Sequence, residues 1–117
     1  MRNFKELKIW QKGFEIAVKS FKLVSSFPKE EKFGMSTQIT RAAVSIPSNI
    51  AEGSSRSSEK DYNRFIEISL GSSFEMETHL LIAAAANFGD TDLRNDILRD
   101  IDEEQKMLIS FMNKLNK

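Results

Sequence analysis

The residues best suited to acid–base or metal chemistry lie in the segment EMETH, residues 75–79. Glu75 and His79 are four positions apart, so a helix would place both side chains on one face. A ferritin-like dimetal site needs two Glu-x-x-His motifs and two further glutamates, whereas this chain has a single histidine at a different spacing. It also has no cysteine, which excludes disulfides and thiolate ligands. We therefore expect no metal and no cofactor, and we interpret His79 as a surface or interface residue.

Serine catalysis would require His79 to act as the base for Ser72 or Ser73. Those serines precede His79 by only six or seven positions, and no oxyanion-stabilising group accompanies them. The five glycines stand apart from one another and form no phosphate-binding loop. We therefore expect no catalytic residues and no enzymatic activity.

Charge is balanced overall but unevenly distributed along the 117 residues. Residues 1–34 carry a net charge of +4, and residues 72–117 carry −4. These segments could attract each other within a bundle or between subunits, or they could form two solvated faces of unlike sign. A neutral chain is a poor non-specific ligand for nucleic acid, because such binding depends on neutralising phosphates.

The first element that must position these residues is a helix that ends at Phe27-Pro28, because a residue before proline avoids the helical conformation. Asn3 and Glu6 have the spacing of a capping box. One apolar row has heptad spacing and comprises Leu7, Trp10, Phe14, Ala17, Phe21 and Val24. A second row beside it comprises Ile9, Ile16 and Leu23. We expect a helical turn at 28–34, closed by Gly34 in the left-handed conformation.

The second helix is expected from about Ser36 to Glu52, and it contains Pro47. Its apolar positions lie within about 100° of arc and keep the same phase before and after the proline; they are Ile39, Ala42, Ala43, Ile46 and Ile50. A loop would reset that phase, so we predict a continuous helix with a kink. Proline removes one backbone hydrogen bond and leaves the Ala43 carbonyl for a serine hydroxyl or a water.

Polar residues of this helix form one ridge, which we expect at a bundle seam or a subunit contact. Its members are Gln38, Arg41, Ser45, Ser48, Asn49 and Glu52. The apolar arc widens to roughly 200° when Val44, Pro47 and Ala51 are added, which is about twice what a surface helix of a monomer needs. We therefore expect self-association.

A third helix is expected from Glu59 to Asn87, capped by Ser58, and a fourth from Asp92 to Asn116. The third has one row running from Tyr62 through Phe65, Ser69, Ser73, Met76 and Leu80 to Ala83, and a second row of Ile66, Leu70, Phe74, Leu81 and Phe88. The fourth has Ile97, Ile101, Leu108, Phe111 and Leu115 in heptad register, with Glu104 in the gap position. No strand pattern is present. The chain is thus predicted to be all-α, a single domain over 1–117 forming an up-down antiparallel four-helix bundle kinked at Pro47.

Three segments resemble proteins associated with 23S rRNA intervening sequences, the S23 family. They are FKELKIWQKGFEIA, FPKEEKFGMSTQITRAAVSIPSNIAEGSSR and FIEISLGSSFEMETHL, of which SIPSNIAEG is the most specific. The resemblance implies a four-helix bundle, a ring-like homopentamer and a role near RNA. The chain is also similar to accessory proteins that bind a reverse transcriptase and nucleic acid. Relatives commonly carry two basic residues where this chain has Thr40-Arg41, which weakens the implied RNA contact.

Two functions follow as expectations. The first is a homo-oligomeric scaffold that contacts RNA or DNA weakly through the lysines of the first helix, namely Lys5, Lys8, Lys12 and Lys19. The second is a protein-binding adaptor for a nucleic-acid enzyme such as a reverse transcriptase. No apolar run reaches the roughly 18 residues of a membrane span, and the first residues lack a signal-peptide core. We expect a soluble cytoplasmic protein without membrane contact.

Overall fold

The computed structural model describes residues 3–116 and contains four α-helices and no strand within that range. The helices are α1 (Lys8–Val24), α2 (Met35–Ser54), α3 (Glu59–Ala85) and α4 (Thr91–Leu115). Two short 3₁₀ turns, η1 (Phe4–Glu6) and η2 (Lys29–Glu31), precede α1 and α2. The prediction of an all-helical chain is therefore confirmed.

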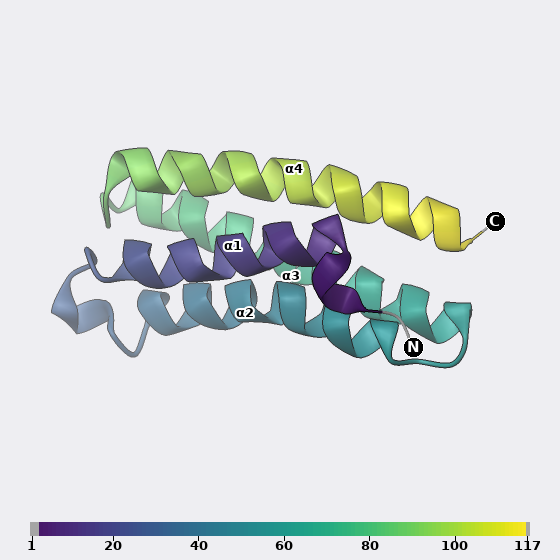
Figure 1. The fold of residues 1–117 in the computed structure, drawn as a ribbon. Coiled ribbons are helices and arrows are strands. Elements are labelled where there is room, and N and C mark those ends of the chain that lie inside the picture. The colour runs from purple at the N-terminus through teal and green to yellow at the C-terminus, as the bar shows by residue number, and fades with distance from the viewer. Residues whose placement is uncertain (1–2, 117) are drawn as a thin grey trace.

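The four helices form an elongated bundle of 44 × 22 × 20 Å. Helix α1 packs against α2 and α4, and α3 packs against the same two helices. The backbones of the diagonal pairs, α1 with α3 and α2 with α4, do not approach each other closely within the described part of the chain. The helices lie side by side along one axis, with the start of α1 and the end of α4 at the same end (Figure 1). The pair α1–α2 and the pair α3–α4 therefore form opposite sides of the molecule.

The core-facing rows of α2 and α4 are those predicted from the sequence. All five predicted positions of α2 are buried, namely Ile39, Ala42, Ala43, Ile46 and Ile50. Helix α4 buries Ile97, Ile101 and Leu108, and Glu104 in the gap position is buried with them. In α3 the first predicted row is buried at every position but Phe65.

Helix α1 is rotated relative to the sequence prediction. Its buried row is Ile9, Ile16 and Leu23, whereas Phe14 and Phe21 of the expected seam face solvent and are 49% and 56% exposed. The physical reason is that neighbouring helices on both sides determine how α1 is turned about its axis. Lysines on one side of α1 pair with α4, and Gly13 on its other side packs closely against α2.

Helix α2 continues through Pro47, so the predicted continuity of SIPSN is confirmed. A serine hydroxyl does bind a carbonyl near the proline, but at a different residue from the one expected. Ser69 Oγ of α3 donates to the carbonyl of Ile46 at 2.9 Å, rather than to that of Ala43. This buried bond ties α3 to α2 at the proline.

The ends of the helices match the predicted caps only in part. Ser58 caps α3 as predicted, because its side chain accepts from the backbone N–H of Asp61. Asp90, for which no cap was predicted, caps α4 by accepting from the backbone N–H of Leu93. Asn3 instead caps η1, and α1 begins at Lys8 without a side-chain cap. The expected left-handed Gly34 is wrong, since its φ is −108° and α2 starts directly after it.

Two glycines of the bundle should respond oppositely to alanine. A Cβ at Gly53 would lie 2.8 Å from the Cβ of Phe65 and 3.1 Å from Tyr62 Cδ1, so Gly53→Ala must push α2 from α3. We expect it to lower the free energy of unfolding by about 1–3 kcal/mol. A Cβ at Gly71 would meet nothing within 4 Å, so Gly71→Ala should raise that energy by about 0.5–1 kcal/mol.

Urea unfolding followed by circular dichroism measures both changes. Equal stability of the two variants would show that α2 and α3 do not approach each other as closely as described.

Candidate functional site

The residues considered for metal or serine chemistry are not brought together. Within residues 3–116, no group of three or more acidic or histidine side chains could hold a metal ion. Ser72 Oγ is hydrogen-bonded to Ser45 Oγ, and Ser73 Oγ donates to the Leu70 carbonyl, so neither hydroxyl is directed to His79. His79 is half-buried on α3. The arrangement offers no nucleophile paired with a base.

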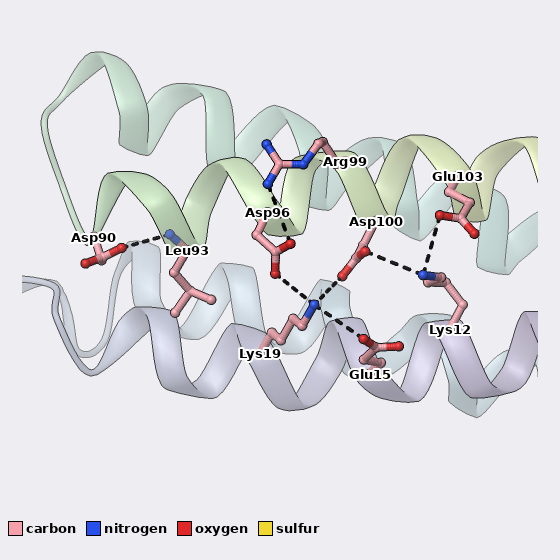
Figure 2. Close-up of polar contacts among 9 residues, drawn as sticks. All are labelled: Lys12, Glu15, Lys19, Asp90, Leu93, Asp96, Arg99, Asp100 and Glu103. Carbon is pink, nitrogen blue, oxygen red and sulfur yellow. Dashed lines mark hydrogen bonds and ion pairs between the residues drawn. The ribbon is translucent and has the colours of Figure 1, made fainter.

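The predicted lysine row of α1 divides into two parts. Lys12 and Lys19 point to α4 and are partly buried, and their ammonium groups lie among its carboxylates (Figure 2). Lys5 and Lys8 are exposed, and neither forms an ion pair within the described part of the chain. Nucleic-acid contact at these four lysines stays a prediction, but only the second pair is free of competing carboxylates.

Lys19 is the centre of the charged contact between α1 and α4. Its Nζ lies 2.7 Å from Asp100 Oδ2 and 2.8 Å from Asp96 Oδ2, and 3.4 Å from Glu15 Oε1 on its own helix. Hydrogen bonds to Asp100 and Asp96 raise the pKa of Lys19 well above its usual range. The same ammonium group lowers the pKa of Asp96. These bonds hold α1 against α4 and keep both partners charged.

Lys12, two turns before Lys19 on α1, extends this contact along α4 to Glu103. Its Nζ lies 3.5 Å from Asp100 Oδ1 and 3.5 Å from Glu103 Oε2 (Figure 2). Burial lowers the pKa of Lys12, but the charges of Asp100, Glu103 and Glu15 outweigh it and raise that pKa on balance. The unlike charges of the first and last segments therefore attract each other within one bundle.

The polar ridge of α2 also divides. Ser45 and Asn49 are half-buried at the seam with α3, where Ser45 Oγ meets Ser72 Oγ at 2.8 Å and Asn49 Nδ2 bonds to Ser45 at 2.8 Å. The remaining members are exposed, namely Gln38, Arg41, Ser48 and Glu52. Glu52 pairs with Arg56 one turn later, at 3.1 Å. The first two residues thus have a role in bundle packing, and a subunit contact at the others stays a prediction.

An apolar stripe runs along the outer side of α1. Phe14, Val18 and Phe21 have i, i+4, i+7 spacing and are 49%, 56% and 56% exposed. The ring of Trp10 packs on Phe14 at 5.2 Å between centroids. Phe21 lines one surface hollow together with Ser36 of α2, which places the stripe beside that helix.

Helix α2 contributes Val44 to the same side of the molecule. Val44 is exposed and precedes Pro47 by one turn, and Pro47 packs beside Gly13 of α1. We name the set of Phe14, Val18, Phe21 and Val44 the α1–α2 face.

A second apolar surface lies on the opposite side of the bundle. Glu77 of α3 accepts a hydrogen bond from Gln105 of α4 at 2.8 Å, which marks the side of α3 that meets α4. Phe74 and Leu81 flank Glu77 by one turn in each direction, and Ile109 follows Gln105 by one turn. All three are about half exposed. We name Phe74, Leu81 and Ile109 the α3–α4 face.

The exposed Lys8 lies at the rim of a groove of about 370 Å³ between the start of α1 and the last turns of α4. Leu7, Ile9, Met107 and Phe111 supply its apolar part, and Lys106 and Lys114 share the rim with Lys8. Lys106 is paired with Asp102 at 3.0 Å. Glu103 also lines the groove, so three lysines and one carboxylate border it.

Removing the central ammonium group should weaken the contact between α1 and α4. We expect Lys19→Met to lower the free energy of unfolding by about 1–2 kcal/mol, between the values for exposed and buried ion pairs. Lys22→Met, at an exposed position on α1, is the matched control and should change little.

The loss of unfolding free energy in Lys19→Met should depend on pH, because the pKa of Asp96 is lowered in the folded state. A carboxyl with a lowered pKa contributes stability above its ordinary pKa of 3.8 and loses it as pH falls through the folded value. Urea unfolding should thus separate the variant from the parent at pH 6 and bring them together near pH 2. A constant difference across that range would contradict the assignment.

Comparison with known proteins identifies the family. The family model of the 23S rRNA-intervening sequence protein matches residues 5–110. A crystal structure described as a protein with unknown function from the S23 ribosomal protein family of Bacteroides thetaiotaomicron is similar, with a TM-score of 0.79 and 28% identity. That match covers 89% of this chain and 97% of the other. No curated protein matches. Within residues 3–116, no helix has the length and apolar character needed to cross a membrane. The chain belongs to the 23S rRNA-intervening sequence protein family.

Proposed function

We propose that this protein is a non-enzymatic, self-associating helical scaffold that binds nucleic acid weakly in the cytoplasm. The observation that carries the proposal is the presence of two exposed apolar faces on opposite sides of one bundle. Contiguous apolar residues on a surface mark sites of association, because water gains entropy when they are covered.

The placement of the two faces favours a head-to-tail assembly. The α1–α2 face is rich in aromatic rings, and the α3–α4 face combines one ring with aliphatic side chains. A contact between unlike faces leaves a free face at each end, so it continues until the rotation closes a ring. Five subunits are carried over from the family resemblance.

The scaffold of the proposal is an up-down antiparallel bundle with a kink in α2 at Pro47. Its support is the cyclic packing order α1, α2, α3, α4 and the uninterrupted helix on both sides of the proline. A bend at Pro47 would tilt the first half of α2, and with it Val44, relative to the second half.

Nucleic-acid contact is proposed at the end of the bundle where Lys5, Lys8 and Lys114 are exposed. Because Lys12 and Lys19 are occupied by α4, one subunit offers few free cations, and the net charge is zero. Binding by one subunit should therefore be weak, and a ring would multiply it.

A second candidate function is a protein-binding adaptor for a nucleic-acid enzyme such as a reverse transcriptase. It is favoured by the hollow beside Phe21, which Val24 and Phe27 extend and Lys29 and Lys32 border. An apolar hollow with a basic border fits an acidic segment of another protein.

Charged substitutions within either face should dissociate the assembly. We expect the parent protein to be an oligomer and Phe21→Glu to be a folded monomer by size exclusion with light scattering. Phe33→Glu is the matched control, since Phe33 is 88% exposed in the connection before α2 and lies outside both faces. A monomeric parent at micromolar concentration would remove the proposal.

Mixing two variants tests the head-to-tail arrangement. Phe21→Glu keeps the α3–α4 face intact, and Leu81→Glu keeps the α1–α2 face intact. Each alone should be monomeric, whereas their mixture should form a one-to-one dimer that cannot extend. Self-association of Leu81→Glu alone would indicate contact between like faces instead.

Binding of a structured RNA should fall as salt rises, and the slope should depend on the free lysines. We expect the double variant Lys5→Ala/Lys8→Ala to reduce the log–log slope by about 1–2, since each lost phosphate contact removes about 0.7–0.9. Lys22→Ala/Lys29→Ala, at two exposed lysines elsewhere, should keep the parent slope. Absence of binding at low salt would rule out the nucleic-acid role without affecting self-association.

A further inference from the structure

Glu104 is a carboxyl group inside the core of the bundle. Its relative exposure is 0%, and neither carboxylate oxygen has a hydrogen-bond partner among the described residues. Room for it exists because α1 has no side chain at Gly13. A Cβ there would lie 3.0 Å from Glu104 Oε2, 3.1 Å from Ile46 Cγ2 and 3.4 Å from the nitrogen of Pro47. The carboxyl therefore enters a junction of α1, α2 and α4.

One cation acts on this group without forming an ion pair with it. The charge of Lys12 on α1 lowers the pKa of Glu104, but burial outweighs it, and the Lys12 ammonium is paired with Asp100 and Glu103. Both of those α4 residues are acids, and Glu103 opposes a further negative charge at Glu104.

The other helices bring no positive charge to the junction. Helix α2 presents Ile46 and Pro47 there, which are apolar. The acid that α3 directs to this part of α4 is Glu77, which binds the side chain of Gln105. An ionised Glu104 would thus be a buried charge with neither a hydrogen bond nor an ion pair among the described residues, which is strongly unfavourable.

We propose that Glu104 is a proton-binding residue of the core, whose neutral form permits α1 to pack on α4 and whose ionisation loosens that contact. The structure thereby contains a pH-sensitive junction at Gly13. This inference does not depend on the proposed function, because it concerns packing within one subunit.

The direction of the effect follows from the proton balance. Burial raises the pKa of Glu104 from 4.5 to about 8 in the folded protein. Between those values the folded state retains a proton that the unfolded state has lost, so stability is present below pH 4.5 and decreases as pH rises toward 8. One proton corresponds to at most a tenfold fall in the folding equilibrium constant per pH unit. The effect of Asp96 lies below pH 4 and does not overlap with this window.

Carbon-13 NMR of glutamate carboxyls in the full chain observes the proton directly. We expect one carboxyl resonance of the parent to titrate near pH 8, and we expect it to be missing in Glu104→Gln. If every glutamate carboxyl titrates near its ordinary value, the proposal is overturned. This result requires only the parent protein, so it stands even where a variant folds poorly.

Unfolding equilibria from pH 5.5 to 8.5 test the consequence. The folding constant of the parent should fall by up to tenfold per pH unit, whereas that of Glu104→Gln should stay nearly constant. Glu75→Gln, at an exposed acid of α3 outside the junction, is the matched control and should retain the parent slope. All three are compared in a His79→Gln background, so that none of them contains a histidine. A parent slope equal to that of Glu104→Gln would refute the junction.

Amide hydrogen exchange locates the change. At each pH, the protection factor of an amide in the parent is divided by that of the same amide in Glu104→Gln. The intrinsic acceleration of exchange by hydroxide is the same in both proteins and cancels in this ratio. We expect that ratio to fall above pH 8 in α1 and α4 around residues 13 and 104, with the Ser45–Ser72 seam less affected. A uniform loss over all four helices would show that ionisation weakens the whole bundle and would contradict a local junction.

Discussion

The rotation of α1 about its own axis is the constraint on which the rest of the structure depends. On one side, Lys12 and Lys19 bind the carboxylates of α4, and on the other, Gly13 lies close to Ile46 and Pro47 of α2. Together these contacts turn Ile9, Ile16 and Leu23 inward and leave the aromatic row at the surface. The same rotation opens the space that Glu104 occupies. The core, the exposed apolar face and the buried acid therefore have a common origin.

The seam between α2 and α3 follows a different principle, close approach of small residues. Gly53 faces Phe65 and Tyr62, while Ser69 and Ser72 reach α2 through hydroxyl groups. Serine costs helix propensity, but a buried hydroxyl that bonds a neighbouring helix recovers part of that cost. Pro47 is tolerated within α2 because neighbouring helices contact α2 at this point, α1 through Gly13 and α3 through the hydrogen bond from Ser69 to the Ile46 carbonyl. The segment SIPSNIAEG thus supplies the contacts of α2 with both α1 and α3. These contacts require particular residue types, which explains why the segment is more specific to the family than the apolar positions around it.

Much of the fold could be predicted from the sequence, because α2 and α4 each have one row that suits burial better than any alternative. In α3 the first of two predicted rows is buried except at Phe65, whereas Phe74 and Leu81 of the second row are exposed. The unbroken phase across Pro47 indicated a continuous helix, and the structure has one. The sequence showed Glu104 in a gap of the apolar row of α4 but did not predict its burial. Helix α1 could not be resolved this way. Its two apolar rows both satisfy helical spacing, and only the position of α4's acids decides between them. For the same reason, the sequence could not separate Lys12 and Lys19 from Lys5 and Lys8.

The division of those lysines bears on what the bundle can do. Ion pairs within a subunit occupy cations that a nucleic acid would need, and they leave a particle of zero net charge that carries exposed apolar faces. An apolar surface on each side favours contact between copies of the chain. An assembly would then present the few free lysines of each copy many times over, which would strengthen its binding to nucleic acid. In the proposed scaffold, association therefore comes first, and the affinity for nucleic acid depends on it. A helix whose rotation exposed Lys12 and Lys19 would bury Phe14 and Phe21, so the two properties exclude each other on α1.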